Sequence, residues 1–153
     1  MQKEWFAEWF NTEYYHILYQ DRNEEEANRF ISNLISFLNI PKNSKLLDLA
    51  CGKGRHSKIL NSFSYDVLGV DLSENSILKA RKETTETLRF ETHDMRKVIP
   101  NLKFDAVFNL FTSFGYFNTP AENQKMCSSV SEMLNSKGKF IIDFMNAEKV
   151  IRN

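Results

Sequence analysis

The chain of 153 residues is long enough for one domain that buries a core without help from disulfides or metals. Its 42% hydrophobic and 26% charged residues are typical of a soluble globular protein, and no apolar stretch is long enough to cross a membrane. Its 20 basic and 20 acidic residues cancel, which disfavours nucleic acid and anionic membranes as partners.

The cysteines and the N-terminal sequence narrow the setting further. Cys51 and Cys127 lie far apart and lack the paired spacing of a metal or redox site, so we expect free thiols and no bound metal. The first residues lack the continuous apolar run of a secretory signal, which favours a cytoplasmic protein.

Hydrophobic periodicity predicts that helices and strands alternate along the chain. Apolar residues recur every three or four positions over 24–38, which predicts an amphipathic helix. Ser73 and the pair Thr119-Pro120 are suited to begin two later helices. In chain order, the elements expected after the first helix are a strand at 46–50, a helix at 54–60, a strand at 65–70, a helix at 74–82, strands at 88–92 and 104–109, a helix at 120–134 and a strand at 139–144.

This order of elements predicts the α/β class, with a doubly wound, mostly parallel sheet and helices on both faces. In such sheets, ligands bind beyond the carboxyl ends of the strands, at the point where the strand order reverses. We therefore expect the functional residues in the loops that follow the first four strands.

The loop after the first strand has the composition of a ligand-binding turn. Asp48 stands near the strand end, and Gly52 and Gly54 allow a tight turn in which a ligand can lie against the backbone. The helix that follows offers N–H groups to a carboxylate or a phosphate. A dinucleotide fingerprint requires a third glycine where this chain has Ser57, and the P-loop spacing does not occur, so nicotinamide cofactors and ATP are disfavoured.

An acidic residue, Asp71, follows the second strand. It comes roughly 20 residues after Asp48, close to the spacing at which a carboxylate binds ribose hydroxyls. A residue at this position can instead cap the next helix, but Ser73 is better placed for that role. Asp71, with its neighbour Leu72, therefore predicts a nucleoside site.

Residues 46–54 read LLDLACGKG and resemble motif I of class I S-adenosylmethionine-dependent methyltransferases, in which an acidic residue precedes (Gly/Ala)-x-Gly-x-Gly. Four residues occupy the motif positions: Asp48, Ala50, Gly52 and Gly54. The resemblance implies a Rossmann-like sheet with strand order 3-2-1-4-5 and S-adenosylmethionine as cofactor. It also implies that the loop, Cys51 included, wraps the methionine portion of the cofactor, with Asp48 on the side of the ammonium group.

The same family places further cofactor contacts after the third and fourth strands. By this resemblance, Asp94 would accept a hydrogen bond from the exocyclic amine of adenine, and Met95 would pack on the ring. Asn109 and Leu110 would face the methionine portion and the incoming nucleophile. Methyltransferases that act on exocyclic amines of nucleic-acid bases usually have Asn/Asp/Ser-Pro-Pro-aromatic here, whereas this chain reads Asn-Leu-Phe-Thr, which disfavours that substrate class.

Aromatic residues near the N-terminus and after the fourth strand indicate where the substrate binds. Residues 5–22 resemble the leading helix of a bacterial small-molecule subgroup of this family, where it would lie across the cofactor mouth. We therefore expect residues 1–40 to form a helical lid over a cofactor-binding core at 41–153. Packing against a sheet edge or within loops is the alternative role for these side chains. The candidate substrate and lid residues are Tyr14, Tyr15, Tyr19, Phe111 and Phe114, with His16, Tyr116 and Phe117 as further candidates.

These features predict methyl transfer to a small-molecule acceptor by in-line displacement, in which the protein aligns the acceptor in a dry pocket. The catalytic residue stays unassigned. A binding module without turnover and a nicotinamide-dependent oxidoreductase are the alternatives. The family sheet has two strands beyond the five expected here, so we expect a fragment of a longer protein and an exposed edge on the fifth strand through which a homodimer can form.

Overall fold

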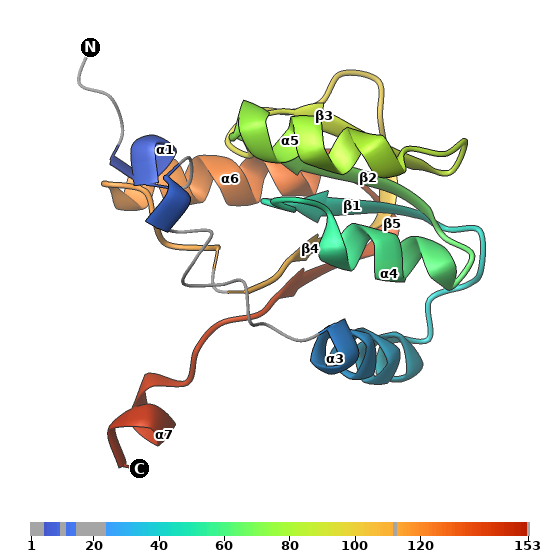
Figure 1. Cartoon of the computed structure of the whole chain (residues 1–153), viewed down its shortest axis with the longest axis horizontal. Coiled ribbons are helices and arrows are strands. Elements are labelled where there is room, and N and C mark those ends of the chain that lie inside the picture. The colour runs from blue at the N-terminus through green and yellow to red at the C-terminus, as the bar shows by residue number, and fades with distance from the viewer. Residues whose placement is uncertain (1–4, 10–11, 15–23, 112, 153) are drawn as a thin grey trace.

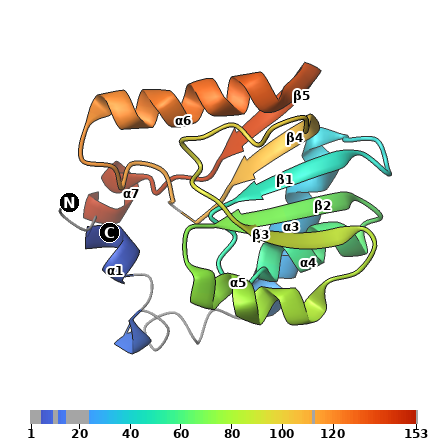
Figure 2. The ribbon, with the colours of Figure 1, turned by 90° about the horizontal axis from the view of Figure 1, so that it is seen from above.

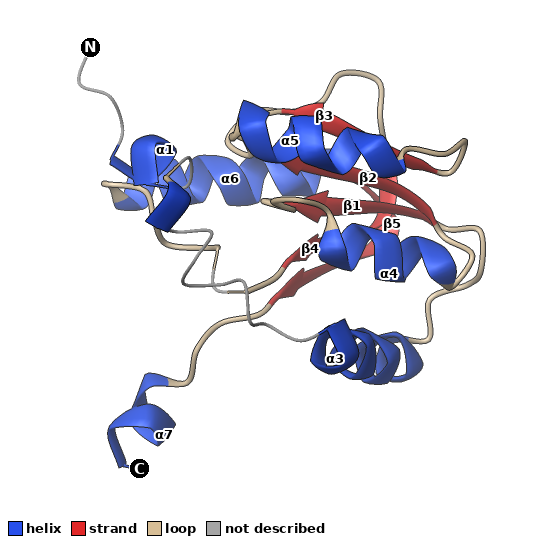
Figure 3. Ribbon diagram, in the orientation of Figure 1, coloured by secondary structure: helices blue, strands red, loops and turns tan. Residues whose placement is uncertain are grey.

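The structure is a computed structural model that describes residues 5–9, 12–14, 24–111 and 113–152. Its parallel strands form one sheet in the order β3-β2-β1-β4-β5, with helices on both faces (Figure 1, Figure 3). The strands are β1 (Lys45–Leu49), β2 (Asp66–Asp71), β3 (Leu88–Thr92), β4 (Phe104–Asn109) and β5 (Leu134–Ile142). The helices are α1 (Trp5–Trp9), α3 (Glu24–Leu38), α4 (Arg55–Ser62), α5 (Glu74–Ala80), α6 (Pro120–Met133) and α7 (Ala147–Arg152), with a 3-10 turn at Arg81–Glu83. The predicted fold class and strand order are confirmed.

Alternate residues of each strand enter two hydrophobic cores, one on each face of the sheet. Leu46 and its register partner Val67 pack with α3, α4 and α5, whereas the next pair, Leu47 and Leu68, packs with α6. Figure 2 shows this division, with α6 on one side of the sheet and α3, α4 and α5 on the other. None of the described helices is both long and apolar enough to cross a membrane.

The fifth strand differs from its prediction at both ends. It begins at Leu134 instead of residue 139 and ends at Ile142 instead of residue 144. Leu134 pairs with Phe104, and Lys139 pairs with Ala106, so the residues between them form an irregularity in the strand, where Lys137 has a φ of 65°. The polar, glycine-containing sequence of this irregularity is typical of a loop, which is why the prediction started the strand too late. The short helix α7 was not predicted, and a homodimer through the edge of β5 stays a prediction.

The close approach of α4 to the sheet depends on Gly69 in β2. A Cβ at this position would lie 2.7 Å from Phe90 Cδ1 and 2.8 Å from Ser57 Oγ. Both neighbours are buried, Phe90 on β3 and Ser57 on α4. The missing side chain therefore lets α4 lie close to the sheet, next to the loop that connects β1 to α4.

Gly69→Ala should destabilise the protein by about 1–3 kcal/mol, the usual cost of overpacking a core. Urea unfolding measures this loss. Phe90→Leu removes ring atoms that the added methyl group would meet, so the double variant should lose less stability than the two single variants together. Additive losses would mean that Phe90 does not limit the space at this position.

Candidate functional site

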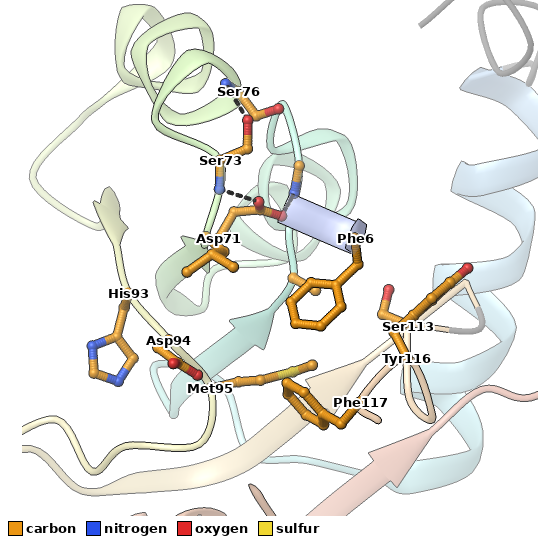
Figure 4. Close-up of a pocket in the computed structure, with 13 residues that line it drawn as sticks. Phe6, Asp71, Ser73, Ser76, His93, Asp94, Met95, Ser113, Tyr116 and Phe117 are labelled. Carbon is orange, nitrogen blue, oxygen red and sulfur yellow. Dashed lines mark hydrogen bonds between the residues drawn. The ribbon is translucent and has the colours of Figure 1, made fainter. Parts of the chain in front are cut away.

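A cavity opens at the carboxyl ends of β1, β2 and β3, next to α1 and the loop between β4 and α6 (Figure 4). Its position agrees with the rule for ligand sites in open α/β sheets. Six predicted cofactor residues line it: Ala50, Gly52, Asp71, Leu72, Asp94 and Met95. Among the described residues, seven more line it: Phe6, Ser73, Ser76, His93, Ser113, Tyr116 and Phe117.

The loop between β1 and α4 bends through three residues with positive φ: Ala50, Gly52 and Gly54. Gly52 lines the cavity, and a Cβ there would meet no atom within 4 Å, so its backbone faces open space. Gly54 instead lies over Phe90, whose Cε1 would be 2.5 Å from an added Cβ. The first glycine thus leaves the cavity wall bare, and the second lets α4 begin close to the sheet.

Asp48 lies beneath this loop and not in the cavity lining. It is 2% exposed and accepts a hydrogen bond of 2.6 Å from the Ser57 hydroxyl. Burial raises the pKa of Asp48 to about 7, the bond from Ser57 opposes this rise, and the charge of Asp71 adds to it. Cys51 is buried as well, and burial together with both carboxylates raises the pKa of its thiol. The orientation of Asp48 toward a ligand ammonium group stays a prediction.

Asp71 lines the cavity at the end of β2 and connects two loops. Its carboxylate accepts hydrogen bonds of 2.8 Å from the backbone N–H groups of Gly52 and Ser73. Burial raises the pKa of Asp71, and these backbone bonds oppose the rise. Ser73 caps α5 by accepting a hydrogen bond from the Ser76 N–H, as predicted. Because Ser73 provides the helix cap, Asp71 is not needed for that role. Each oxygen of Asp71 can accept a second hydrogen bond, so its carboxylate is available for a ligand.

The end of β3 contributes Asp94 and Met95. The Asp94 carboxylate accepts hydrogen bonds from Arg96 through the backbone N–H at 2.9 Å, Nε at 3.0 Å and Nη2 at 2.8 Å. Burial opposes the charge on Asp94, but the bonds from Arg96 outweigh it and hold the pKa of this carboxyl below its ordinary value. Arg96 also pairs with Glu122 at 2.7 Å and lies over the Phe117 ring, with its Cζ 4.7 Å from the ring centre.

The end of β4 lies behind the cavity. Asn109 and Leu110 are buried and do not line it, although the Asn109 amide lies 3.9 Å from the sulfur of Met95. Phe111 has a φ of 57° and stacks on His56 of α4, with 4.5 Å between ring centres. The prediction that Phe111 lines a substrate pocket is therefore not met in this cavity. Phe114 packs in the core next to α6 and does not line the cavity either.

Among the described residues of the N-terminal segment, Phe6 places an aromatic ring in the cavity, and that ring was not predicted. Phe6 of α1 is buried, and its ring lies perpendicular to the Phe117 ring, with 5.6 Å between ring centres (Figure 4). The ring centres of Trp5 and Tyr116 lie 5.8 Å apart. Tyr14 is 74% exposed and does not line the cavity. The candidates Tyr15, His16 and Tyr19 lie outside the described residues.

A family model described as a methyltransferase domain matches residues 40–152. The chain belongs to this methyltransferase family. The match confirms the resemblance that motif I suggested. It spans all five strands and every cavity-lining residue named above except Phe6 of α1.

Individual methyltransferases match the chain over most of its length. The dTDP-3-amino-3,4,6-trideoxy-alpha-D-glucopyranose N,N-dimethyltransferase of Streptomyces venezuelae is 34% identical over 103 residues, which are 67% of this chain and 43% of that protein. The crystal structure of Streptomyces venezuelae DesVI matches with a TM-score of 0.70 and 31% identity, over 86% of this chain and 56% of DesVI. CalS10 of Micromonospora echinaspora, an amino pentose methyltransferase with S-adenosylmethionine bound, has the same fold (TM-score 0.71, 23% identity, 88% of this chain and 57% of CalS10). The chain thus spans about half the length of these relatives.

The buried carboxyl of Asp48 predicts a pH dependence of stability. Because its pKa in the folded protein exceeds that of an unfolded chain, its stabilising contribution is complete below about pH 4 and is lost as the pH rises through about 7. Asparagine does not titrate, so Asp48→Asn removes this loss. The unfolding free energy of the variant, measured relative to that of the wild type, should therefore rise by roughly 1–3 kcal/mol from about pH 5 to about pH 8. Urea unfolding at both pH values measures the difference.

Ser57→Ala serves as the matched variant for Asp48→Asn. It removes a hydrogen bond that favours the ionised carboxylate, so its loss of stability should be larger at about pH 8 than at about pH 5. Parallel stability curves for the wild type and Asp48→Asn across this range would contradict the assignment.

Proposed function

We propose that this chain binds S-adenosylmethionine in the cavity and contributes to methyl transfer onto the amino group of a small molecule, with amino sugars as the substrate class. The observation that carries the proposal is the pair of carboxylates, Asp71 and Asp94, at the ends of neighbouring strands beside the apolar side chains of Leu72 and Met95. Acceptors of hydrogen bonds next to an apolar surface suit the ribose and the base of a nucleoside.

Residues of the cavity suit the ribose, the base and the amino-acid portion of the cofactor. Asp71 is oriented by two backbone bonds and would accept from the ribose hydroxyls. Asp94 would accept from the adenine amine, and Leu72 and Met95 would pack on the ring. The bare backbone at Gly52, beside the start of α4, suits the amino-acid portion, because a side chain there would project into the space that the cofactor needs.

When bound, S-adenosylmethionine supplies a methyl group activated by its sulfonium. In this reaction class the protein aligns the acceptor nitrogen with the methyl group and keeps water out. The aromatic side chains of Phe6, Tyr116 and Phe117, which line the cavity, support such an exclusion of water. Phe6 also supports a lid role for the N-terminal segment, although the ring involved is not one of the predicted tyrosines.

The acceptor class is inferred from the matched proteins. One relative at 34% identity is an N,N-dimethyltransferase of a nucleotide-linked amino sugar, and CalS10 is an amino pentose methyltransferase. A binding module without turnover is the second candidate, because the chain spans about half the length of these enzymes. A nicotinamide-dependent oxidoreductase is disfavoured by membership of the methyltransferase family.

Calorimetric titration tests the cofactor. The wild type should bind S-adenosylmethionine and S-adenosylhomocysteine but not NAD, and Asp71→Ala should weaken binding about tenfold or more, because hydrogen bonds to a charged group are lost. Asp66→Ala is the matched control, since Asp66 and Asp71 are the first and last residues of β2 and only Asp71 lines the cavity. Equal affinities of the two variants, or binding of NAD alone, would overturn the proposal.

Incubation with S-adenosylmethionine and a nucleotide-linked amino sugar tests the reaction. We expect S-adenosylhomocysteine to form and the sugar to gain one or two methyl groups by mass spectrometry, whereas the matching sugar with a hydroxyl in place of the amine should stay unmodified. Asp66→Ala should retain this activity, and Asp71→Ala should lose most of it. Cofactor binding without transfer to any amino sugar would favour the binding module.

A further inference from the structure

Arg96 occupies a central position between the end of β3 and the start of α6, although it does not line the cavity. Its guanidinium bonds to Asp94 on one side and to Glu122 on the other, and its flat face lies over Phe117. We infer that Arg96 is a positioning residue that makes the site selective for a 6-amino purine, by holding Asp94 ready to accept from that amino group. The inference rests on the proposed cofactor.

The contacts of Arg96 fix the carboxylate in one orientation. The backbone N–H and Nε reach Oδ1 of Asp94 at 2.9 and 3.0 Å, and Nη2 reaches Oδ2 at 2.8 Å. Two side-chain bonds from one planar group set the plane of the carboxylate as well as its distance. Both side chains are half-buried, with 17% exposed for Arg96 and 16% for Asp94, so water screens the pair less than it would at the surface.

The guanidinium itself is fixed by two further groups. Glu122 accepts a bond of 2.7 Å from Nη1, and its other oxygen belongs to the capping box of α6, where it bonds with Thr119. Phe117 presents its ring face 4.7 Å from the guanidinium carbon, and the same ring lines the cavity. Arg96 therefore sets the positions of an acceptor and of an apolar wall at once.

The chemistry of an ionised carboxylate makes this arrangement selective. Arg96 holds the pKa of Asp94 below its ordinary value against the effect of burial, so the carboxylate is charged at neutral pH. A charged carboxylate accepts hydrogen bonds and cannot donate one. It can bind the 6-amino group of adenine, but it repels the 6-oxo oxygen of hypoxanthine. A buried polar group that loses its partner in this way discriminates strongly between two ligands.

Calorimetry with S-adenosylhomocysteine and S-inosylhomocysteine, which differ at this purine position, tests the inference without turnover. The wild type should prefer the adenine compound about tenfold or more. Arg96→Lys keeps the charge but loses the planar fork, so the preference should fall several-fold toward equality. Arg89→Lys is the matched control, because Arg89 makes a 2.8 Å ion pair with Asp66 at the opposite end of the strands. The Arg89→Lys variant should prefer the adenine compound as strongly as the wild type does.

Three other results of this calorimetry would contradict the role of Arg96, the role of Asp94 or the proposed function. Equal weakening of both ligands by Arg96→Lys would reduce Arg96 to a structural role, and a wild type that binds both ligands equally would remove Asp94 as the adenine acceptor. Failure of the wild type to bind either ligand would instead overturn the proposed function. If Arg96→Lys does not fold, Glu122→Gln decides: it retains an acceptor for Thr119 but loses the charge that holds Arg96, and an unchanged preference would refute the inference.

Discussion

Asp71 holds the loops after β1 and β2 in one arrangement, and the geometry of the cavity depends on it. One oxygen accepts from the N–H of Gly52 and the other from the N–H of Ser73, so a single carboxylate ties the glycine turn to the start of α5. Backbone bonds use only part of the capacity of a carboxylate, which can accept about four hydrogen bonds. The group that organises the two loops can therefore also bind a ligand, and its fixed orientation lowers the entropy cost of binding.

The residues of motif I serve two purposes that the motif itself does not distinguish. Ala50 and Gly52 reach the cavity, whereas Asp48 and Gly54 lie behind its wall, Asp48 bonded to Ser57 and Gly54 packed on Phe90. Burial of Asp48 near another carboxylate costs folding free energy that the single bond from Ser57 offsets only in part. Such a local cost is typical of sites that are built for binding and not for stability alone.

Hydrophobic periodicity was sufficient to predict the sheet and the residues at its carboxyl ends, because parallel strands bring those ends together whatever the loops do. Asp71 could be placed on this ground, whereas Asp94 was singled out by the resemblance to the methyltransferase family. Side-chain directions in the loops could not be predicted. Phe6 lines the cavity and packs perpendicular to Phe117, which is distant in sequence. Nothing in the local pattern separates Phe6 from the other aromatic residues near it. Phe111 turns away because its positive φ, which a sequence pattern does not reveal, directs the ring onto α4.

Helix α6 positions the segment after β3 although none of its residues lines the cavity. Its contacts with that segment run from its first turn to its last residue: Glu122 with Arg96 at 2.7 Å, Ser129 Oγ with the Met95 carbonyl at 3.0 Å, and the sulfur of Met133 with the Ile99 N–H at 3.3 Å. A shift of α6 would therefore move the whole segment, Asp94 included, as one unit. The capping box at Thr119 then does more than stabilise a helix end. By holding Glu122 it also holds the arginine that orients Asp94, so the start of α6 is coupled to one end of the cavity through a chain of polar contacts.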